Sequence, residues 1–349
     1  ADPNLKILRN SKVKEVKGFV GNFESVIESA SGNEETVAHG VVIVATGGEE
    51  LIPSQYRYGI DKRVIRQSEL EDMVADDKLD AKRLVMIQCV GARCRDRSYC
   101  SRICCSEAVK NAIALKRKYP DCDVTILHKD VRTYGLHELK YREAQELGVK
   151  LVRFPEDKEP KVEDRDGGLG ILVCDADLED EELELDADAL VLSVPMVPNQ
   201  ENQELAKMLK VPLSKDGFFL EAHMKLRPVD FATDGIFVAG SAHWPKFADE
   251  CIAQAYAAVS RACTILSKSS IEGEGIVPAV DACRCTGCGL CAAVCVTNAI
   301  DISQGIAVVN EALCKGCGSC VGTCPSGAIQ QKHLRDDQII EMIKSAVSE

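Results

Sequence analysis

The sequence predicts an α/β body followed by a small, cysteine-rich α+β module. Buried-strand runs alternate with helical segments between residues 5 and 267, which is typical of α/β folds. Glycines follow directly after two of these strands, and a cysteine spacing is repeated near the C-terminal end. A chain of 349 residues with 46% hydrophobic content can bury a large core, and its length favours at least two domains.

Composition disfavours several classes of function. No run approaches the roughly 18 uninterrupted apolar residues of a membrane span, so we expect no span and take the cytoplasm as the default location. Nucleic-acid binding is not expected, because basic residues are not interleaved with aromatic ones. The net charge of −13 lies almost wholly in residues 156–188, which hold 15 acidic and 3 basic side chains. We interpret this segment as a solvated hairpin rather than a docking surface.

The 18 cysteines indicate metal ligands rather than disulfides, given the chain length and the absence of a signal peptide pattern. Five lie between residues 89 and 105, and nine between residues 283 and 324. We expect the remaining four to be core residues: Cys122, Cys174, Cys251 and Cys263.

The C-terminal module is predicted by an internal repeat. Residues 285–300 and 314–329 each read C-x2-C-x2-C-x3-C, at an offset of 29. This spacing is typical of two [4Fe–4S] clusters, where three cysteines of one loop bind one cluster and the fourth binds the other. A zinc ribbon would leave half of the thiols without a role, and Cys283 lies outside the motif. The expected ligand sets are Cys285, Cys288, Cys291 and Cys324 for one cluster, and Cys314, Cys317, Cys320 and Cys295 for the other.

The body of the chain contains one α/β unit inserted into another. The outer unit has buried strands at residues 41–45 and 235–239, each followed by glycine. The inserted unit is expected to have strands at 84–90, 124–128 and 189–194, and helices at 101–118 and 137–147.

The outer strands "VVIVATGG" and "DGIFVAGSA" resemble the flavin-binding parts of the pyridine nucleotide-disulfide oxidoreductase fold. The inserted unit resembles that family's nicotinamide domain. It has only one glycine after its first strand instead of G-x-G-x-x-G, so nicotinamide binding is not expected there. The resemblance implies that FAD is approached by the backbone at the strand-ending glycines and near the start of the following helix. The matching residues are Gly47, Gly240, Ser241, Ala253 and Gln254.

The segments "CVGARCRDRSYCSRICC" and "GFFLEAHMKLRPV" resemble the A subunit of heterodisulfide reductase and its relatives. That resemblance implies a third [4Fe–4S] cluster in the inserted unit and a lysine, Lys110, close to the flavin. Cys94 is not part of the family pattern. Alternative interpretations are a redox-active Cys104–Cys105 dithiol and a solvated Lys110. The implied ligands of the third cluster are Cys89, Cys100, Cys104 and Cys105.

The expected domains follow from these patterns. Residues 1–61 and 195–268 form an incomplete FAD-binding-like domain, and residues 62–194 form the inserted nicotinamide-domain-like unit with its cluster. Residues 275–333 form a bacterial-type 2[4Fe–4S] ferredoxin domain, and residues 334–349 a C-terminal helix.

The resemblance implies an iron-sulfur flavoprotein that transfers electrons within a cytoplasmic oxidoreductase complex, with flavin-based bifurcation in some members. It implies FAD, three [4Fe–4S] clusters, an oligomeric assembly and partner subunits that perform the final substrate chemistry. A ferredoxin, hydrogenase or dehydrogenase is the expected electron donor. Alternatives are the equivalent component of a soluble benzoyl-CoA reductase or quinone-interacting complex, a disulfide reductase using Cys104 and Cys105, and a carrier without flavin.

A flavin dinucleotide fold of this type starts with a strand that runs into G-x-G-x-x-G, and none precedes Val41. Residues 13–29 are instead typical of a hairpin around Gly18 and Gly21. We therefore expect the FAD site to be completed by residues outside this sequence, through either a longer chain or a separate polypeptide.

Overall fold

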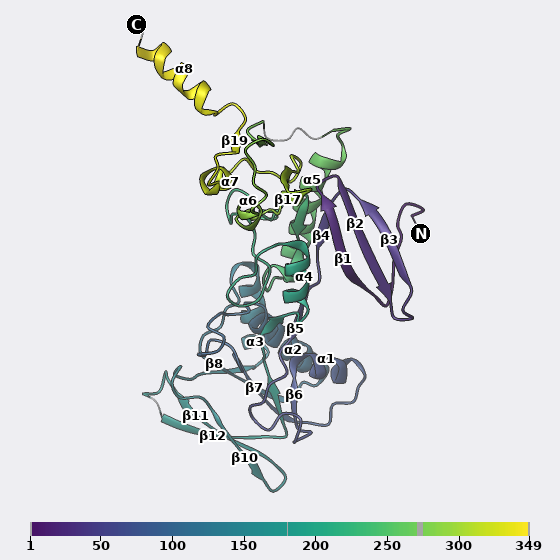
Figure 1. Ribbon diagram of the computed structural model, residues 1–349. Helices are drawn as coiled ribbons and strands as arrows, with labels where there is room; N and C mark the ends of the chain where they lie inside the picture. Colours follow the sequence, from purple (N-terminus) through teal and green to yellow (C-terminus); the bar gives the residue numbers. More distant parts are fainter. Residues whose placement is uncertain (1, 180, 271–274, 348–349) are drawn as a thin grey trace.

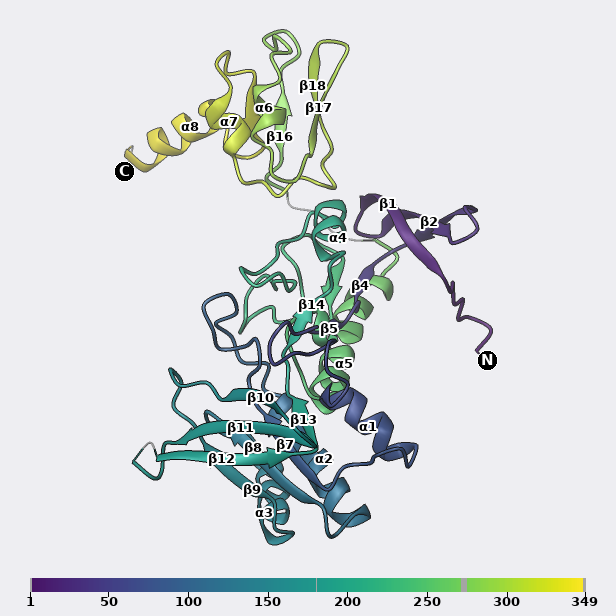
Figure 2. The ribbon, with the colours of Figure 1, turned by 90° about the horizontal axis from the view of Figure 1, so that it is seen from below.

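The computed structural model describes residues 2–179, 181–270 and 275–347 (Figure 1). The inserted unit lies at one end of an elongated molecule and the cysteine-rich module at the other, with a small antiparallel sheet beside the middle (Figures 1 and 2). No helix in the described part of the chain is long and apolar enough to cross a membrane.

The N-terminal sheet is antiparallel, in the order β1-β2-β3. The expected hairpin at residues 13–29 is present, with Gly18 and Gly21 at positive φ where the chain turns. Phe23 is the side chain that anchors this otherwise exposed sheet to the core of the middle part. The strands are β1 (Ser11–Phe19), β2 (Asn22–Ser29) and β3 (Glu34–His39).

The middle part holds the two glycine-ending strands, which pair in parallel. A second, antiparallel pair leads the chain into and out of the inserted unit. The strands are β4 (Val42–Val44) with β15 (Ile236–Val238), and β5 (Gly48–Glu50) with β14 (Met196–Pro198). The helices are α4 (Asn202–Leu209) and α5 (Ala248–Leu266), and a 3-10 turn spans Gly240–Ala242.

Helix α5 packs through one face only. Ala258 and Ala262 are buried against β15. An adjoining face exposes large apolar side chains at helical spacing, among them Ile252 (58% exposed), Tyr256 (75%) and Val259 (50%). Helix α5 therefore has one apolar face that packs against the core and a second apolar stripe that faces solvent.

The inserted unit is a parallel sheet of five strands in the order β6-β13-β7-β8-β9, which confirms the α/β fold class. Both faces are covered, as parallel sheets require. The side chains of Leu84 and Met86 face the helices, and those of Val85 and Ile87 face the antiparallel strands. The parallel strands are β6 (Val64–Arg66), β7 (Arg83–Ile87), β8 (Asp123–His128), β9 (Lys150–Arg153) and β13 (Ala189–Leu192). The helices are α1 (Gln67–Ala75), α2 (Cys104–Lys118) and α3 (Glu138–Glu146), the last preceded by a 3-10 turn at Gly135–His137.

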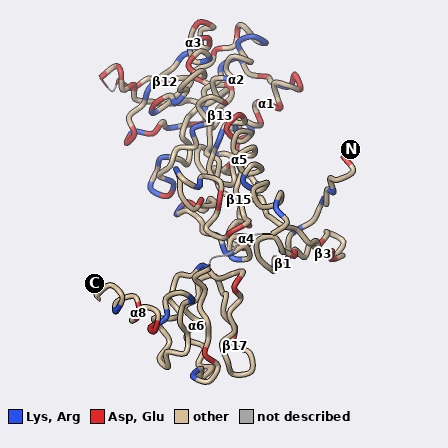
Figure 3. Tube along the Cα trace, turned by 90° about the horizontal axis from the view of Figure 1, so that it is seen from above, with Lys and Arg blue, Asp and Glu red and all other residues tan. Residues whose placement is uncertain are grey.

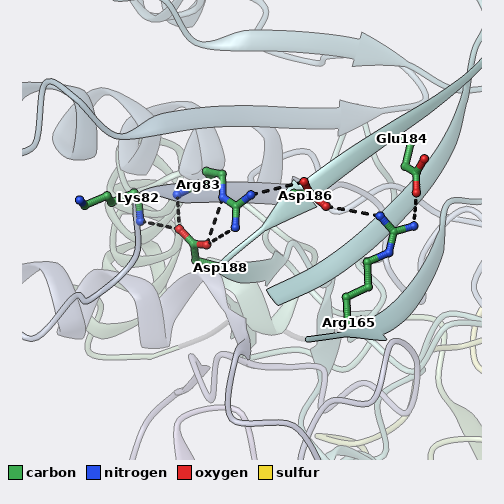
Figure 4. A network of polar contacts seen from close by, with 6 residues as sticks. All are labelled: Lys82, Arg83, Arg165, Glu184, Asp186 and Asp188. Atoms are coloured by element: carbon green, nitrogen blue, oxygen red, sulfur yellow. Dashed lines mark hydrogen bonds and ion pairs between the residues drawn. The ribbon is translucent and has the colours of Figure 1, made fainter. Parts of the chain in front are cut away.

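The acidic segment is more than the expected solvated hairpin. It forms a three-stranded antiparallel sheet whose inner face, including Leu169 and Ile171, is fully buried against the parallel sheet. Its outer acidic residues pair with arginines, which neutralises part of the charge (Figures 3 and 4). Asp180 lies outside the described residues. The strands are β10 (Lys161–Arg165), β11 (Gly168–Asp175) and β12 (Glu181–Ala187).

Asp188 ties this sheet to the start of β7 (Figure 4). Its carboxylate accepts hydrogen bonds from the backbone amides of Lys82 (2.9 Å) and Arg83 (2.8 Å) and from the Arg83 guanidinium (2.6 Å). Arg83 lowers the pKa of Asp188 through this side-chain hydrogen bond. The contact holds the connection between β12 and β13 next to the start of β7.

The cysteine-rich module has two similar halves. Its first and last strands pair, which closes the module, and a final helix extends away from it (Figure 1). Figure 3 shows few charges on the module outside that helix. The strands are β16 (Pro278–Val280) with β19 (Ile329–Gln331), and β17 (Ile300–Ser303) with β18 (Ile306–Val309). The helices are α6 (Leu290–Ala293), α7 (Ser319–Thr323) and α8 (Asp336–Val347); residues 348 and 349 of the expected last helix lie outside the described residues.

Candidate iron-sulfur and flavin sites

The two cysteine loops of the module have the same backbone shape. Gly287 and Gly316 occupy equivalent places with φ of +64° and +62°. A Cβ at Gly287 would lie 2.3 Å from the carbonyl oxygen of Gly305, and one at Gly316 would lie 2.6 Å from that of Ile276. Glycine is therefore required sterically in both loops. The sequence repeat therefore corresponds to a repeat of backbone conformation in the two loops.

A small cavity lies inside the first loop and is lined by Cys285, Cys288 and Cys291. Cys324, from the second half of the module, lines the same cavity. The structure thus brings together the four cysteines expected to bind one cluster. Backbone amides point to the sulfur atoms as well, since the N–H of Ala307 donates to Cys285 Sγ at 3.5 Å. Such donors stabilise thiolates and tune iron-sulfur sites.

The structure also gives contacts for the members of the second set. Cys314 and Cys317 lie close enough to Cys320 to contribute, after burial, to a raised pKa of its thiol. Cys295 packs in the same apolar cluster as Cys320, and its sulfur accepts a hydrogen bond from the amide of Ala299 at 3.2 Å. In the described part of the chain, no three His, Cys, Asp or Glu side chains converge on the position of a single metal ion. A cubane, by contrast, holds its four thiolates at separate corners.

In the inserted unit, the cysteine loop connects β7 to α2. Cys89 follows the strand with φ +63°, and Cys104 and Cys105 form the first turn of the helix, where the helix dipole favours thiolates. Burial, with the nearby thiols Cys105 and Cys100, raises the pKa of Cys89 to about 11. The hydrogen bond with Cys105 and burial raise the pKa of Cys104, and the nearby thiols Cys89 and Cys100 add to the rise. These four cysteines are therefore neighbours in space. Cys94 lies in a separate tight turn, where its amide donates to the carbonyl of Arg97 at 3.0 Å.

Basic side chains surround this loop. Arg93 forms ion pairs with Asp130 and Glu156 and is only 15% exposed. The Lys129 side chain is 4% exposed, and its charge opposes the rise in the pKa of Cys89. Arg132 interacts with Cys100. A thiolate-ligated cluster is anionic, and this positive surrounding is of the kind that would stabilise it.

Two buried donor groups close to these cysteines in sequence have no hydrogen-bond partner in the described part of the chain: Nε of Arg102 and Oγ of Ser106. The acceptor Oε1 of Gln88, next to Cys89 in sequence, is also buried without a partner there. Buried donors are normally satisfied, so an acceptor is expected here. The thiol set, its burial and the unsatisfied donor groups fit an iron-sulfur cluster.

The expected flavin residues fall in two places. Gly47 and Gly240 both have positive φ, of +75° and +72°, at the ends of β4 and β15. A Cβ on Gly47 would lie 3.8 Å from Ser241 Oγ, so these positions are adjacent. Ala253 and Gln254 lie in the second turn of α5 rather than near its start, because the helix already begins at Ala248.

Gln254 takes part in a polar cluster that the sequence did not indicate. Its side-chain nitrogen is 2.8 Å from Nδ1 of His243, and Nε2 of His243 is 2.7 Å from Glu221. Burial lowers the pKa of His243, although the hydrogen bond to Glu221 opposes this. His243 lies two residues after Ser241 in the sequence. This proximity to the glycine-ending strand was the sequence signal that could have indicated His243. The cluster fixes the orientation of Gln254.

Lys110 lies on α2 with its side chain 54% exposed and paired with Glu71 of α1 at 2.6 Å. A role for it near the flavin stays a prediction. Arg102 and Lys129 were also missed as individual residues. The high density of basic residues after Cys89 was a signal for Arg102. Lys129 follows β8 at the same sheet edge as Cys89.

Comparisons with known proteins give one match to the cysteine-rich module and others to most of the chain. A family model described as a 4Fe-4S dicluster domain matches residues 284–328. The A subunit of the H(2):CoB-CoM heterodisulfide,ferredoxin reductase of Methanothermobacter thermautotrophicus is 40% identical over 330 residues, covering 89% of this chain and 50% of that protein. The iron-sulfur A subunit of the CoB–CoM heterodisulfide reductase of Methanocaldococcus jannaschii is 40% identical over 335 residues, covering 87% and 50%.

The chain is a homologue of the heterodisulfide reductase A subunit. It spans about half the length of these curated relatives. Solved structures that align with this homologue include Lactococcus lactis thioredoxin reductase, at 16% identity and a TM-score of 0.48 over 74% of this chain and 75% of that one. The Escherichia coli flavoprotein disulfide reductase RclA aligns at 12% identity and a TM-score of 0.47, over 76% and 53%.

Proposed function

We propose that this homologue of the heterodisulfide reductase A subunit transfers electrons between FAD and three [4Fe–4S] clusters within a cytoplasmic oxidoreductase complex. The observation that carries the proposal is the cavity where Cys324 joins Cys285, Cys288 and Cys291. Relatives named as iron-sulfur subunits support it. When bound, the flavin would supply two-electron chemistry and the clusters one-electron chemistry.

The residues of this chain would have distinct roles in that activity. Twelve cysteines in three groups would bind the clusters as thiolates, and the loop glycines would hold the backbone in the required shape. Arg93 and Lys129 would offset the charge of the cluster in the inserted unit. Gly47 and Gly240 would let the backbone approach the flavin, while His243 would orient Gln254.

We also propose that residues outside the 349 contact the adenosine and pyrophosphate of FAD. The parallel pair β4–β15 has no third strand in the described part of the chain, although parallel sheets are normally wider and covered on both faces. The apolar stripe of α5, near this pair, is a surface that such residues could cover. They would belong to a longer chain or to a partner subunit.

One measurement tests the cofactor content: the visible spectrum of the native protein and of the cofactor released by acid, with iron and acid-labile sulfide counted. We expect a flavin in the complete assembly and about twelve iron atoms per chain. Clusters without any flavin in the assembly would favour the alternative of a simple carrier. Copurifying subunits would distinguish a heterodisulfide reductase from a benzoyl-CoA reductase or a quinone-interacting complex.

A second candidate function is disulfide reduction by Cys104 and Cys105. The hydrogen bond from Cys104 lowers the pKa of Cys105 to about 7, which favours a reactive thiolate. Both side chains are buried, however, at 3% and 4% exposure. Metal-depleted protein that still reduces disulfides and shows a titratable dithiol would support this candidate over the iron-sulfur site.

A further inference from the structure

Arg102 has an unusual backbone conformation. It lies between Cys100 and Cys104 with φ +64°, in the left-handed region that favours glycine. Residues other than glycine persist in such conformations where surrounding contacts hold them, often at functional sites. The contacts made by Arg102 therefore show what holds this conformation.

Those contacts join two parts of the molecule. The backbone N–H of Arg102 donates to Cys100 Sγ at 3.3 Å. Its guanidinium Nη2 donates to the Glu250 carboxylate at 2.6 Å and to the carbonyl oxygen of Pro245 at 3.2 Å. Glu250 also accepts the backbone N–H of Phe247 at 2.9 Å, so it caps the N-terminus of α5. Arg102 thus connects the cysteine loop of the inserted unit to the helix that carries Gln254.

The same side chain has an unsatisfied donor. Nε of Arg102 is buried and has no partner among the described residues, although guanidinium N–H groups can only donate. The two thiols nearest in sequence, Cys100 and Cys104, belong to the four grouped cysteines. The sulfur atoms of a cluster bound there are acceptors of the kind that this N–H lacks.

We propose that Arg102 is a positioning residue that donates a hydrogen bond to the cluster in the inserted unit and holds that cluster's loop against α5. This inference rests on the proposed function. A positive charge and an N–H donor stabilise a cluster more strongly after it gains an electron, so Arg102 raises its reduction potential. The bond to Glu250 holds the loop at a fixed place relative to the flavin side of the molecule.

The test is a redox titration of the complete cluster-loaded protein, followed by electron paramagnetic resonance. Arg102→Gly removes the guanidinium but suits the positive φ, so the backbone N–H to Cys100 is kept. Arg95→Gly is the matched control, because Arg95 is an exposed arginine of the same loop. A Cys100→Ser protein identifies the signal of this cluster by its loss.

We expect Arg102→Gly to retain its iron and to shift only this cluster to a more negative potential. A tenfold loss of electron affinity would be about 59 mV for one electron. Arg102→Lys should recover part of the shift, because it restores the charge without the planar donor. Glu250→Gln should shift the potential in the positive direction, since it removes the negative charge beside the guanidinium. A purely structural role would not produce shifts of opposite sign.

Unchanged potentials in Arg102→Gly, or equal shifts in Arg95→Gly, would overturn the inference while leaving the cluster in place. Full iron and an unaltered spectrum in Cys100→Ser would instead contradict the proposed cluster itself. The two failures are therefore distinguishable.

Discussion

Replacing Cys100 should remove one whole cluster. Cys100 is one of four mutually neighbouring thiols, and its sulfur accepts the backbone N–H of Arg102 at 3.3 Å. A serine hydroxyl is far less acidic than a thiol and is a poor iron ligand. Since each cubane contains four irons, Cys100→Ser should lower the iron content from about twelve to about eight atoms per chain. Acid-labile sulfide should fall by the same fraction.

Cys94→Ser is the matched control for this experiment. Cys94 lies in the same loop, but its amide closes a separate turn with Arg97. The substitution should leave iron and sulfide unchanged. Both variants are to be purified and reconstituted anaerobically, and metal is counted per polypeptide. Equal losses from the two variants, or no loss from Cys100→Ser, would refute the ligand assignment in the inserted unit.

Three other predictions follow from the structure. In the native protein, Cys89 and Cys100 should be protected from alkylation. An iron content near eight atoms per chain, with both thiols labelled, would argue against the third cluster. Residues 1–349 alone should bind FAD weakly or not at all in equilibrium dialysis, and tight stoichiometric binding would contradict a site completed from outside. Asp188→Ala should lower the free energy of unfolding by about 2 kcal/mol, because two backbone amides lose their acceptor. The control Asp186→Ala should cost less than about 1 kcal/mol, since its ion pairs are exposed. Because the pKa of Asp188 is lowered on folding, its contribution is present above the unfolded pKa near 3.9 and is lost as the pH falls through the folded pKa. The difference in stability between wild type and Asp188→Ala in urea titrations should therefore narrow at low pH, and a gap of constant size would argue against this account.

The sequence predicted best what depends on local spacing. The C-x2-C-x2-C-x3-C loops need glycines such as Gly287 at fixed positions, so the sequence pattern specifies the backbone conformation. The glycines that end β4 and β15 were located for the same reason. The α/β architecture and the expected ligand groups of the cysteine-rich module came from such patterns, whereas the expected ligand group of the inserted unit came from the family resemblance.

Features that depend on distant contacts were not predictable in this way. The role inferred for Arg102 depends on its hydrogen bond to Glu250, which lies 148 residues away in the sequence. The acidic segment looked solvated because its charges are dense, yet six of the eight residues of β11 are buried. Cys263 was expected in the core and is exposed, since the buried face of α5 is set by Ala258 and Ala262 instead. Helical periodicity alone did not indicate which of two apolar faces would be covered.

The position of Cys324 links iron loading of the first cysteine loop to synthesis of the whole cysteine-rich module. The cavity of the first cysteine loop receives its fourth cysteine from the end of the module, and β16 pairs with β19, which follows that cysteine in the chain. On a ribosome, Cys285, Cys288 and Cys291 emerge first, but they cannot form a four-cysteine site until the last cysteine has been made. A chain truncated before Cys324 would therefore present an open, oxygen-sensitive site. Stable retention of this cluster would mark a chain that has been translated through Cys324.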